Sequence, residues 1–270
     1  MKHPFIILIA ASIASVSFVA WRIHVMKDDP ANASVEIYDP SLSFTGGCQA
    51  VVGSADERFR DPGVSAASTL TVLALGDAAT AYEPRRIATY SIPTDRKVIE
   101  GKQAGIERRQ RLLRDLWERC RSVHPTLVTP IFLGVQQALA DLRAKGCKAV
   151  GRCGLWVATD LEENADRAIA ARFRGYRKST VPLPPTLDNR GIEVTFCGYA
   201  QTAGRILGPS GREIRRSAAR DPYRDNRLQA VWQSLFTRPQ IVKFEPYCPQ
   251  PDNRILRVES KLNPPLEARQ

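Results

Sequence analysis

Three residues with oxygen-bearing side chains lie next to apolar segments, where a binding site could be assembled. Asp77 closes the apolar stretch 69–77, Thr129 directly precedes the apolar stretch 130–146, and Asp160 closes the stretch 153–160. Carboxylate and hydroxyl oxygens are the ligands that Mg²⁺, Ca²⁺ and Mn²⁺ prefer in proteins. If the three side chains meet at one edge of a sheet, they predict a divalent-cation site.

The elements that must position these side chains can be predicted from the hydrophobic pattern. Strands are expected at residues 69–77, 88–92, 153–160 and 191–199, and helices at 105–121, 130–146, 164–175 and 223–236. Strands that alternate with helices predict an α/β, Rossmann-like three-layer fold with a mainly parallel central sheet. Ligands bind at the carboxyl ends of such strands, which is where Asp77 and Asp160 lie. Residues 204–220 are predicted to form an arginine-rich loop.

The amino-terminal segment predicts contact with a membrane. Residues 4–21 are uncharged and, as a helix with a rise of about 1.5 Å per residue, would span roughly 27 Å, close to the thickness of a bilayer core. Residues 1–27 are therefore interpreted as a transmembrane anchor, with a cleaved signal segment as the alternative. Residues 28–67 are interpreted as a linker, 68–237 as the folded domain, and 238–270 as a tail that could add an edge strand.

Six cysteines follow the apolar segment: Cys48, Cys120, Cys147, Cys153, Cys197 and Cys248. An even number of cysteines behind an export-type segment indicates an oxidising compartment with disulfides. Cys147 and Cys153 could pair locally, and Cys48 could pair with Cys248 to join the two ends of the domain. Cys197 lies in an apolar stretch and could instead be a small buried hydrophobic residue.

Three blocks of the chain resemble the von Willebrand factor A (VWA) domain family, in particular its bacterial members. TPIFLGVQQAL at 129–139 resembles the threonine loop and following helix, LWVATDLEEN at 155–164 resembles the strand that ends in T-D-G-x-x-N, and GIEVTFCGYA at 191–200 resembles the next strand. With the strand that ends at Asp77, the resemblance covers residues 68–237. It implies the same three-layer fold and a role in binding proteins.

The family's metal-ion-dependent adhesion site combines a D-x-S-x-S motif with a threonine and a second aspartate. The resemblance therefore implies that Asp77, Thr129 and Asp160 are metal ligands, with Mg²⁺ or Mn²⁺ as the ion. The loop at 77–81 reads DAATA, so Ala79 and Ala81 occupy the two serine positions. Loss of two hydroxyl ligands leaves water to complete the coordination, which lowers affinity.

A degenerate site is therefore the alternative to a functional one. Thr80 lies between the two alanines, and Leu161 occupies a position where the family usually has glycine. Under the alternative, Asp160 and Asn164 would cap the following helix and Asp77 would be a turn residue. No cofactor is assigned with certainty.

The expected function is non-catalytic binding of another protein of the cell envelope by a membrane-anchored, exported domain, periplasmic or extracellular. The expected contact residues are Thr80, Glu162, Arg212, Arg215 and Arg216. Because the net charge is +11, a basic surface that tethers the protein to anionic lipid or nucleic acid is one alternative, although an exported domain is not expected to meet nucleic acid.

A hydrolase is the remaining alternative to a binding protein. It would use the acidic loop at Asp160, with Glu162 and Glu163, or His124 close to Ser122. No catalytic residue is assigned, because no phosphate-binding loop and no complete histidine-based triad is evident in the sequence.

Overall fold

A central sheet organises the part of the chain that the structure describes. The structure is a computed structural model, and the residues it describes are 32–41, 43–44, 46–60, 68–76, 83–91, 102–126, 128–147, 153–173, 184–200, 205–207, 213–215 and 222–251. Six strands form this sheet in the order β3-β2-β1-β4-β5-β8. They are β1 (Ala33–Tyr38), β2 (Thr69–Ala74), β3 (Arg85–Ser91), β4 (Cys153–Ala158), β5 (Glu193–Cys197) and β8 (Val242–Glu245).

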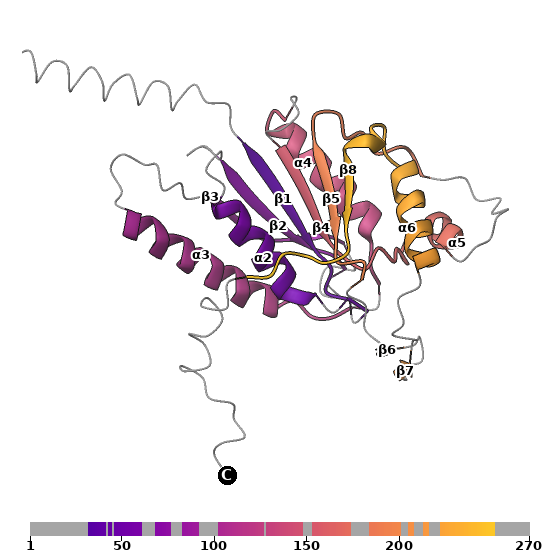
Figure 1. Cartoon of the computed structure of the whole chain (residues 1–270), viewed down its shortest axis with the longest axis horizontal. Helices are drawn as coiled ribbons and strands as arrows, with labels where there is room; N and C mark the ends of the chain where they lie inside the picture. The colour runs from indigo at the N-terminus through magenta and orange to yellow at the C-terminus, as the bar shows by residue number, and fades with distance from the viewer. Residues whose placement is uncertain are drawn as a thin grey trace, which may run out of the picture.

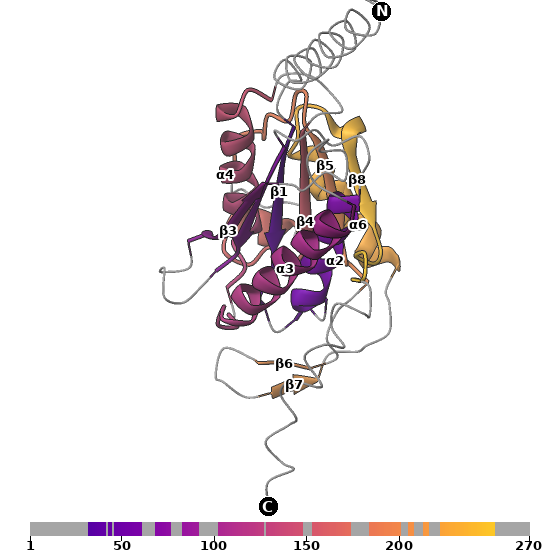
Figure 2. The same ribbon diagram turned by 90° about the vertical axis from the view of Figure 1, so that its left-hand side faces the viewer.

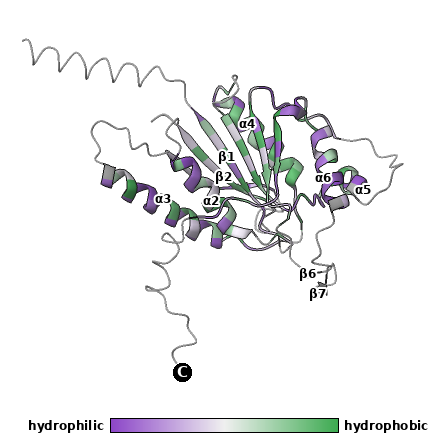
Figure 3. Cartoon of the chain, viewed as in Figure 1, coloured by the Kyte–Doolittle hydropathy of each residue, from purple (hydrophilic) through white to green (hydrophobic). Residues whose placement is uncertain are grey.

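All strand pairs in this sheet are parallel except β2 with β3. Strands β2, β4 and β5 confirm the predicted parallel sheet, β3 confirms the weaker strand prediction near residues 88–92, and β8 confirms the predicted edge strand in the tail. Their β-branched and apolar residues suit a sheet that is buried on both faces. Figure 3 shows this as mainly hydrophobic strands between helices of mixed character.

Helices cover both faces of the sheet and complete three layers, as the sequence predicted (Figures 1 and 2). One core packs β1, β4 and β5 against α4 (Ile131–Ala144) and α6 (Pro222–Ser234), with Ile169 of the short helix α5 (Arg167–Phe173). The other core packs β1, β2 and β3 against α2 (Gly47–Arg60) and α3 (Lys102–Arg121). The strands alternate side chains between these cores, since Val35 and Ile37 lie in the first and Tyr38 in the second.

The interpretation of residues 28–67 as a linker is wrong, because β1 lies at the centre of the sheet and α2 packs on it. Two features disguise these elements in the sequence. Strand β1 carries Ser34 and Glu36 on one face, which breaks the apolar run expected of a buried strand. Helix α2 contains glycine and serine, which favour a loop in the sequence, yet it buries Ala50, Val51 and Val52.

The predicted loop at 204–220 also contains more structure than expected. Strands β6 (Arg205–Leu207) and β7 (Glu213–Arg215) pair as an antiparallel hairpin. The hairpin was missed because each strand has only three residues, too few to show a period-two pattern.

Three disulfides link the elements, and none of the six cysteines is free. Cys147–Cys153 confirms the predicted local pair at the start of β4. The predicted Cys48–Cys248 pair is wrong: Cys48 joins α2 to Cys120 of α3, and Cys248 joins the segment after β8 to Cys197 of β5. Cys197 is buried, as the alternative interpretation expected, but it forms a disulfide and is not only a small hydrophobic residue. Three disulfides fit a protein of an oxidising, extracytoplasmic compartment.

The predicted membrane segment at residues 4–21 lies outside the described residues. Among the helices that are described, none is both long and apolar enough to cross a bilayer.

Candidate functional site

The candidate site lies where the strand order of the sheet reverses. The chain builds outward from β1 to β2 and β3 on one side, and then returns to place β4, β5 and β8 on the other side. At such a switch point, the loops after the two adjacent parallel strands diverge and leave a crevice for a ligand. The loops after β1 and β4 meet at the lower edge of the sheet in Figure 1. We call this the carboxyl edge.

The loop after β1 supplies one buried carboxylate and two hydroxyls. Asp39 is 0% exposed. Its Oδ1 accepts a hydrogen bond from the backbone N–H of Ser41 at 2.8 Å, and its Oδ2 accepts one from the Thr159 hydroxyl at 2.7 Å. The hydroxyl oxygens of Ser41 and Ser43 are 3.0 Å apart. These contacts hold three oxygen-bearing side chains together in one turn.

The loop after β4 supplies a second buried carboxylate. Asp160 is 0% exposed. Its Oδ1 accepts a hydrogen bond from the N–H of Glu162 at 3.0 Å, but its Oδ2 has no hydrogen-bond partner among the described residues. Burial, followed by repulsion from Asp39 and Glu162, raises the pKa of Asp160, while the neighbouring Ser43 hydroxyl opposes this shift. Burial also raises the pKa of Asp39, against the hydrogen bond from Thr159. The two carboxylates therefore disfavour each other's charged form.

Thr129 is fixed beside this loop by two neighbours of Asp160. Thr129 is buried, and its backbone N–H donates to Asn164 Oδ1 at 2.6 Å. Glu163 accepts the N–H of Phe132 at 2.7 Å, in the first turn of α4. A carboxylate at this position satisfies a helix N–H that has no partner within the helix. The acidic loop after β4 is thus hydrogen-bonded to the start of α4.

A second close approach brings the end of β2 to the Thr129 loop. Gly76 has a φ of +65°, and a Cβ added there would lie 2.2 Å from the Val128 carbonyl oxygen. Both the backbone conformation and the lack of space require glycine at this position. In addition, Ser41 and Thr126 form an isolated β-bridge, so the loop after β1 contacts the same segment.

Helix α6 holds the Asp160 loop from the other side. Leu161 has a φ of 67°, a left-handed conformation that is costly for a leucine, and its side chain is fully buried. The Trp232 indole N–H donates to the Leu161 carbonyl at 3.1 Å. At the start of α6, the Arg224 guanidinium pairs with Glu162. The loop is therefore fixed in an unfavourable conformation next to Asp160, as is common at functional sites.

The residues at this site fit a divalent cation. Two carboxylates and the hydroxyls of Ser41, Ser43 and Thr129 are hard oxygen donors, the set that Mg²⁺ and Mn²⁺ prefer. A cation would reverse the repulsion between the carboxylates and would give Asp160 Oδ2 a partner. Within the described part of the chain, no group of three histidine, cysteine or acidic residues could hold a metal.

The structure brings together only some of the predicted site residues. Thr129 and Asp160 lie on joined loops, and Glu162 lies at the rim with Arg224. Asp77, Thr80, Arg212 and Arg216 lie outside the described residues, and so do Ala79 and Ala81. Arg215 belongs to β7, but its side chain is not described.

Asp39, Ser41 and Ser43 were not among the predicted site residues. Residues 39–43 read D-P-S-L-S, which matches the D-x-S-x-S motif of the family that the chain resembles. Because residues 28–67 lack a clear hydrophobic period and are interpreted as a linker, the resemblance assigned this motif to the loop that begins at Asp77. A search of the whole chain for the motif would have found it.

The structure also corrects the expected helix cap. The cap of α5 is Asp166, whose Oδ1 accepts the N–H groups of Ala168 and Ile169 at 2.8 and 3.0 Å. Asp160 instead accepts the N–H of Glu162 within the loop, and Asn164 accepts the N–H of Thr129.

Two contacts bear on the alternative functions. The Ser122 hydroxyl donates to the Arg119 carbonyl at 2.7 Å rather than to His124, which does not favour a nucleophile there. On the basic helix α3, Arg119 pairs with Asp115, and Arg109 lies 3.7 Å from Asp56. Part of the basic surface is therefore neutralised within the fold.

Comparison with known proteins gives distant similarity to solved structures. No family model and no curated protein matches the chain. Among solved structures, the chain is similar to the vWF domain of the type V pili tip protein Mfa5 from Porphyromonas gingivalis, with 12% identity and a TM-score of 0.28. The match covers 59% of this chain and 56% of that chain, so it spans little more than half of each. The site residues named above therefore rest on the geometry of this chain alone.

Proposed function

We propose that the chain binds a divalent cation, Mg²⁺ or Mn²⁺, at the carboxyl edge and uses it to bind a carboxylate of another protein. Asp39, Ser41, Ser43, Thr129 and Asp160 would hold the ion, which would supply positive charge and a coordination position for the partner's carboxylate. This proposal keeps Thr129 and Asp160 from the predicted set and puts Asp39, Ser41 and Ser43 in the place of Asp77. The protein acts by binding and not by catalysis.

One observation carries this proposal: two fully buried carboxylates, on loops from adjacent strands, are surrounded by hydroxyl groups and repel each other. Buried carboxylates normally need a cationic partner. Arg224 lies near Asp160, but its guanidinium is hydrogen-bonded to Glu162. Among the described residues no basic side chain forms an ion pair with either carboxylate, and a small cation would fill this role.

The remaining residues of the loop support the site in defined ways. Thr159 orients Asp39 through its hydroxyl, Glu163 and Asn164 join the loop to the start of α4, and Arg224 neutralises Glu162. Outer residues of this kind fix the orientation of metal ligands. We further propose that the domain acts outside the cytoplasm, bound to the membrane through residues 4–21, with a protein of the cell envelope as its partner.

Calorimetric titration of Mg²⁺ and Mn²⁺ into the full chain tests the proposal. We expect binding heat and an increased melting temperature for the native chain, and neither for Asp39→Ala or Asp160→Ala. Glu118→Gln, an exposed acid in the last turn of α3, is the matched control and should behave as the native chain. Absence of heat and of a thermal shift with both ions would refute the proposed cation site.

A further inference from the structure

The large hydrophobic side chains that are exposed in the described residues all lie at the carboxyl edge. There are three: Leu133 is 44% exposed, Tyr223 is 81% exposed and Tyr247 is 61% exposed. Single exposed hydrophobic residues are normal on a protein surface. Three residues from three separate elements at the same edge as the proposed cation site form a pattern that requires an explanation.

The contacts of neighbouring residues place each side chain at this edge. Leu133 lies in the first turn of α4, four residues after Thr129. The backbone N–H of its neighbour Phe132 donates a hydrogen bond to Glu163 of the Asp160 loop. Tyr223 lies in the first turn of α6 beside Arg224, which pairs with Glu162.

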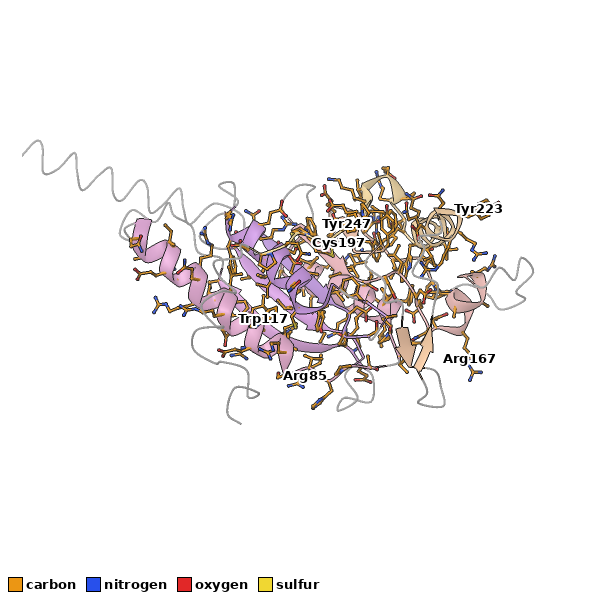
Figure 4. The ribbon with its side chains drawn as sticks, turned by 60° about the horizontal axis from the view of Figure 1, so that its bottom comes forward. Arg85, Trp117, Arg167, Cys197, Tyr223 and Tyr247 are labelled. Carbon is orange, nitrogen blue, oxygen red and sulfur yellow. A yellow bond between two sulfur atoms is a disulfide. The ribbon has the colours of Figure 1, made fainter. Side chains whose placement is uncertain are left out.

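Tyr247 follows the last residue of β8 by two positions. Strand β8 is parallel to β5, so its end lies at the carboxyl edge as well. The N–H of Ala200 donates to the Pro246 carbonyl at 3.0 Å, which holds this segment against the end of β5. In Figure 4, which turns this edge toward the viewer, Tyr247 lies beside Cys197 and Tyr223 lies out on α6.

Positive charge accompanies these side chains at the same edge. Arg85 starts β3, which is antiparallel to β2 and so begins at the carboxyl edge, and Arg167 starts α5. Both are exposed and project outward in Figure 4. Glu83 lies two residues before Arg85 and offsets part of this charge. The edge thus offers apolar and cationic groups around a site suited to a carboxylate.

We propose that Leu133, Tyr223 and Tyr247 form the docking rim for an acidic protein segment in which apolar side chains flank the carboxylate that reaches the cation. This inference rests on the proposed function, because the carboxylate needs the ion. The rim would determine which partner binds. Exposed aromatic residues supply large contact areas in protein interfaces, and Arg85 and Arg167 favour an acidic partner over a basic one. A lone carboxylate, such as acetate, would leave the rim unused.

A displayed library of nine-residue peptides with a fixed central aspartate tests this inference on the full chain. Selection in Mg²⁺ should enrich leucine, phenylalanine, tyrosine or tryptophan beside the aspartate. We expect Leu133→Ser, Tyr223→Ser or Tyr247→Ser to weaken binding of an enriched peptide at least about fivefold each. Gln110→Ser and Arg111→Ser, on the exposed face of α3, are the matched controls and should leave binding unchanged.

The outcomes separate this inference from the proposed function. If Asp39→Ala abolishes peptide binding while the three rim substitutions have no effect, or if polar flanks are enriched, the rim is refuted and the cation site stands. If no peptide is recovered although calorimetry shows Mg²⁺ binding, the rim is refuted too. If the peptides bind equally well in EDTA and to Asp39→Ala, both proposals fail. A dimer of the native chain that the three rim substitutions dissociate would assign the rim to a second copy of the chain and overturn the inference.

Discussion

Glu36 and Asp39 lie three residues apart on and directly after the same strand, and the fold treats these two buried acids differently. Glu36, 1% exposed, lies under α2, where its Oε2 accepts the Ser54 hydroxyl at 2.7 Å. Burial raises the pKa of Glu36 to about 7, opposed first by the nearby Arg58 guanidinium. Arg58 itself lies over the Trp156 ring, with its guanidinium carbon 5.6 Å from the ring centroid.

Asp39 has hydroxyls and a second aspartate around it instead of an arginine. Helix α2 thus places the positive charge of Arg58 near Glu36, whereas under the proposed function the Asp39–Asp160 pair would take a cation from solution. A buried acid is consequently not enough to indicate a ligand site. The charge of the groups that surround it decides whether it is a structural residue or a binding residue.

The largest expected effect of a substitution in this comparison is on cation binding. Asp160→Asn should weaken Mn²⁺ binding at least about 1,000-fold, which is about 4 kcal/mol. The same substitution should raise the melting temperature of the metal-free chain, because it removes the repulsion with Asp39. Calorimetry and thermal unfolding in EDTA measure the two effects, again beside Glu118→Gln. A metal-free variant that is less stable than the native chain would mean that the two acids do not repel each other.

The next effect is a pH dependence of stability due to Glu36. The unfolded chain releases this proton near the ordinary pKa of 4.5, and the folded chain near 7. Because the folded pKa is raised, the folded state binds the proton more tightly, and the free energy of unfolding decreases as the pH rises from about 4.5 to 7. The decrease amounts to about 3 kcal/mol.

Glu36→Gln should therefore be more stable than the native chain at pH 8 and equally stable at pH 4, because glutamine can still accept the Ser54 hydrogen bond. Urea unfolding at the two pH values measures this difference. Glu118→Gln, an exposed acid on α3, is the control and should show no such gain. An equal loss of stability at both pH values would show that Glu36 is a charged partner that Arg58 fully compensates.

The smallest effect concerns the support of the Asp160 loop. Trp232→Phe removes the indole N–H and leaves the buried Leu161 carbonyl without this donor, which should cost about 1 kcal/mol of stability. Because Leu161 follows Asp160, we also expect Mn²⁺ affinity to decrease up to roughly tenfold. Trp117→Phe on α3 is the matched control. If the two variants bind Mn²⁺ equally, α6 does not position the site.

Much of the sheet could be predicted from the sequence, because β2, β4 and β5 are apolar runs that end at turn residues. Helices α3 and α4 could be predicted from their three- and four-residue spacing. The central strand could not, since its buried polar face, with Ser34 and Glu36, is only explained by contacts with α2. Burial of a charge depends on tertiary partners that the local pattern does not contain.

The candidate site was predicted in part for the same reason. Thr129 directly precedes a helix and Asp160 directly follows a strand, both with a clear local pattern, so their place at the carboxyl edge could be predicted. Asp39 follows the strand that was missed, so its D-x-S-x-S motif was read as linker. The disulfide partners of Cys48 and Cys248 depended on the same missing strand and helix, because pairing is set by distance in the fold and not by order in the chain.

The disulfide between Cys197 and Cys248 determines how the domain would respond to a mechanical load. Strand β8 is a four-residue edge strand, which would be easily peeled from β5 if the chain were pulled from its carboxyl-terminal side. Cys248 follows β8 and is bonded to Cys197 at the end of β5. A force applied beyond residue 248 therefore passes through the sulfur bridge into β5, and the segment between the two cysteines, with α6, Tyr223 and Tyr247, carries no tension.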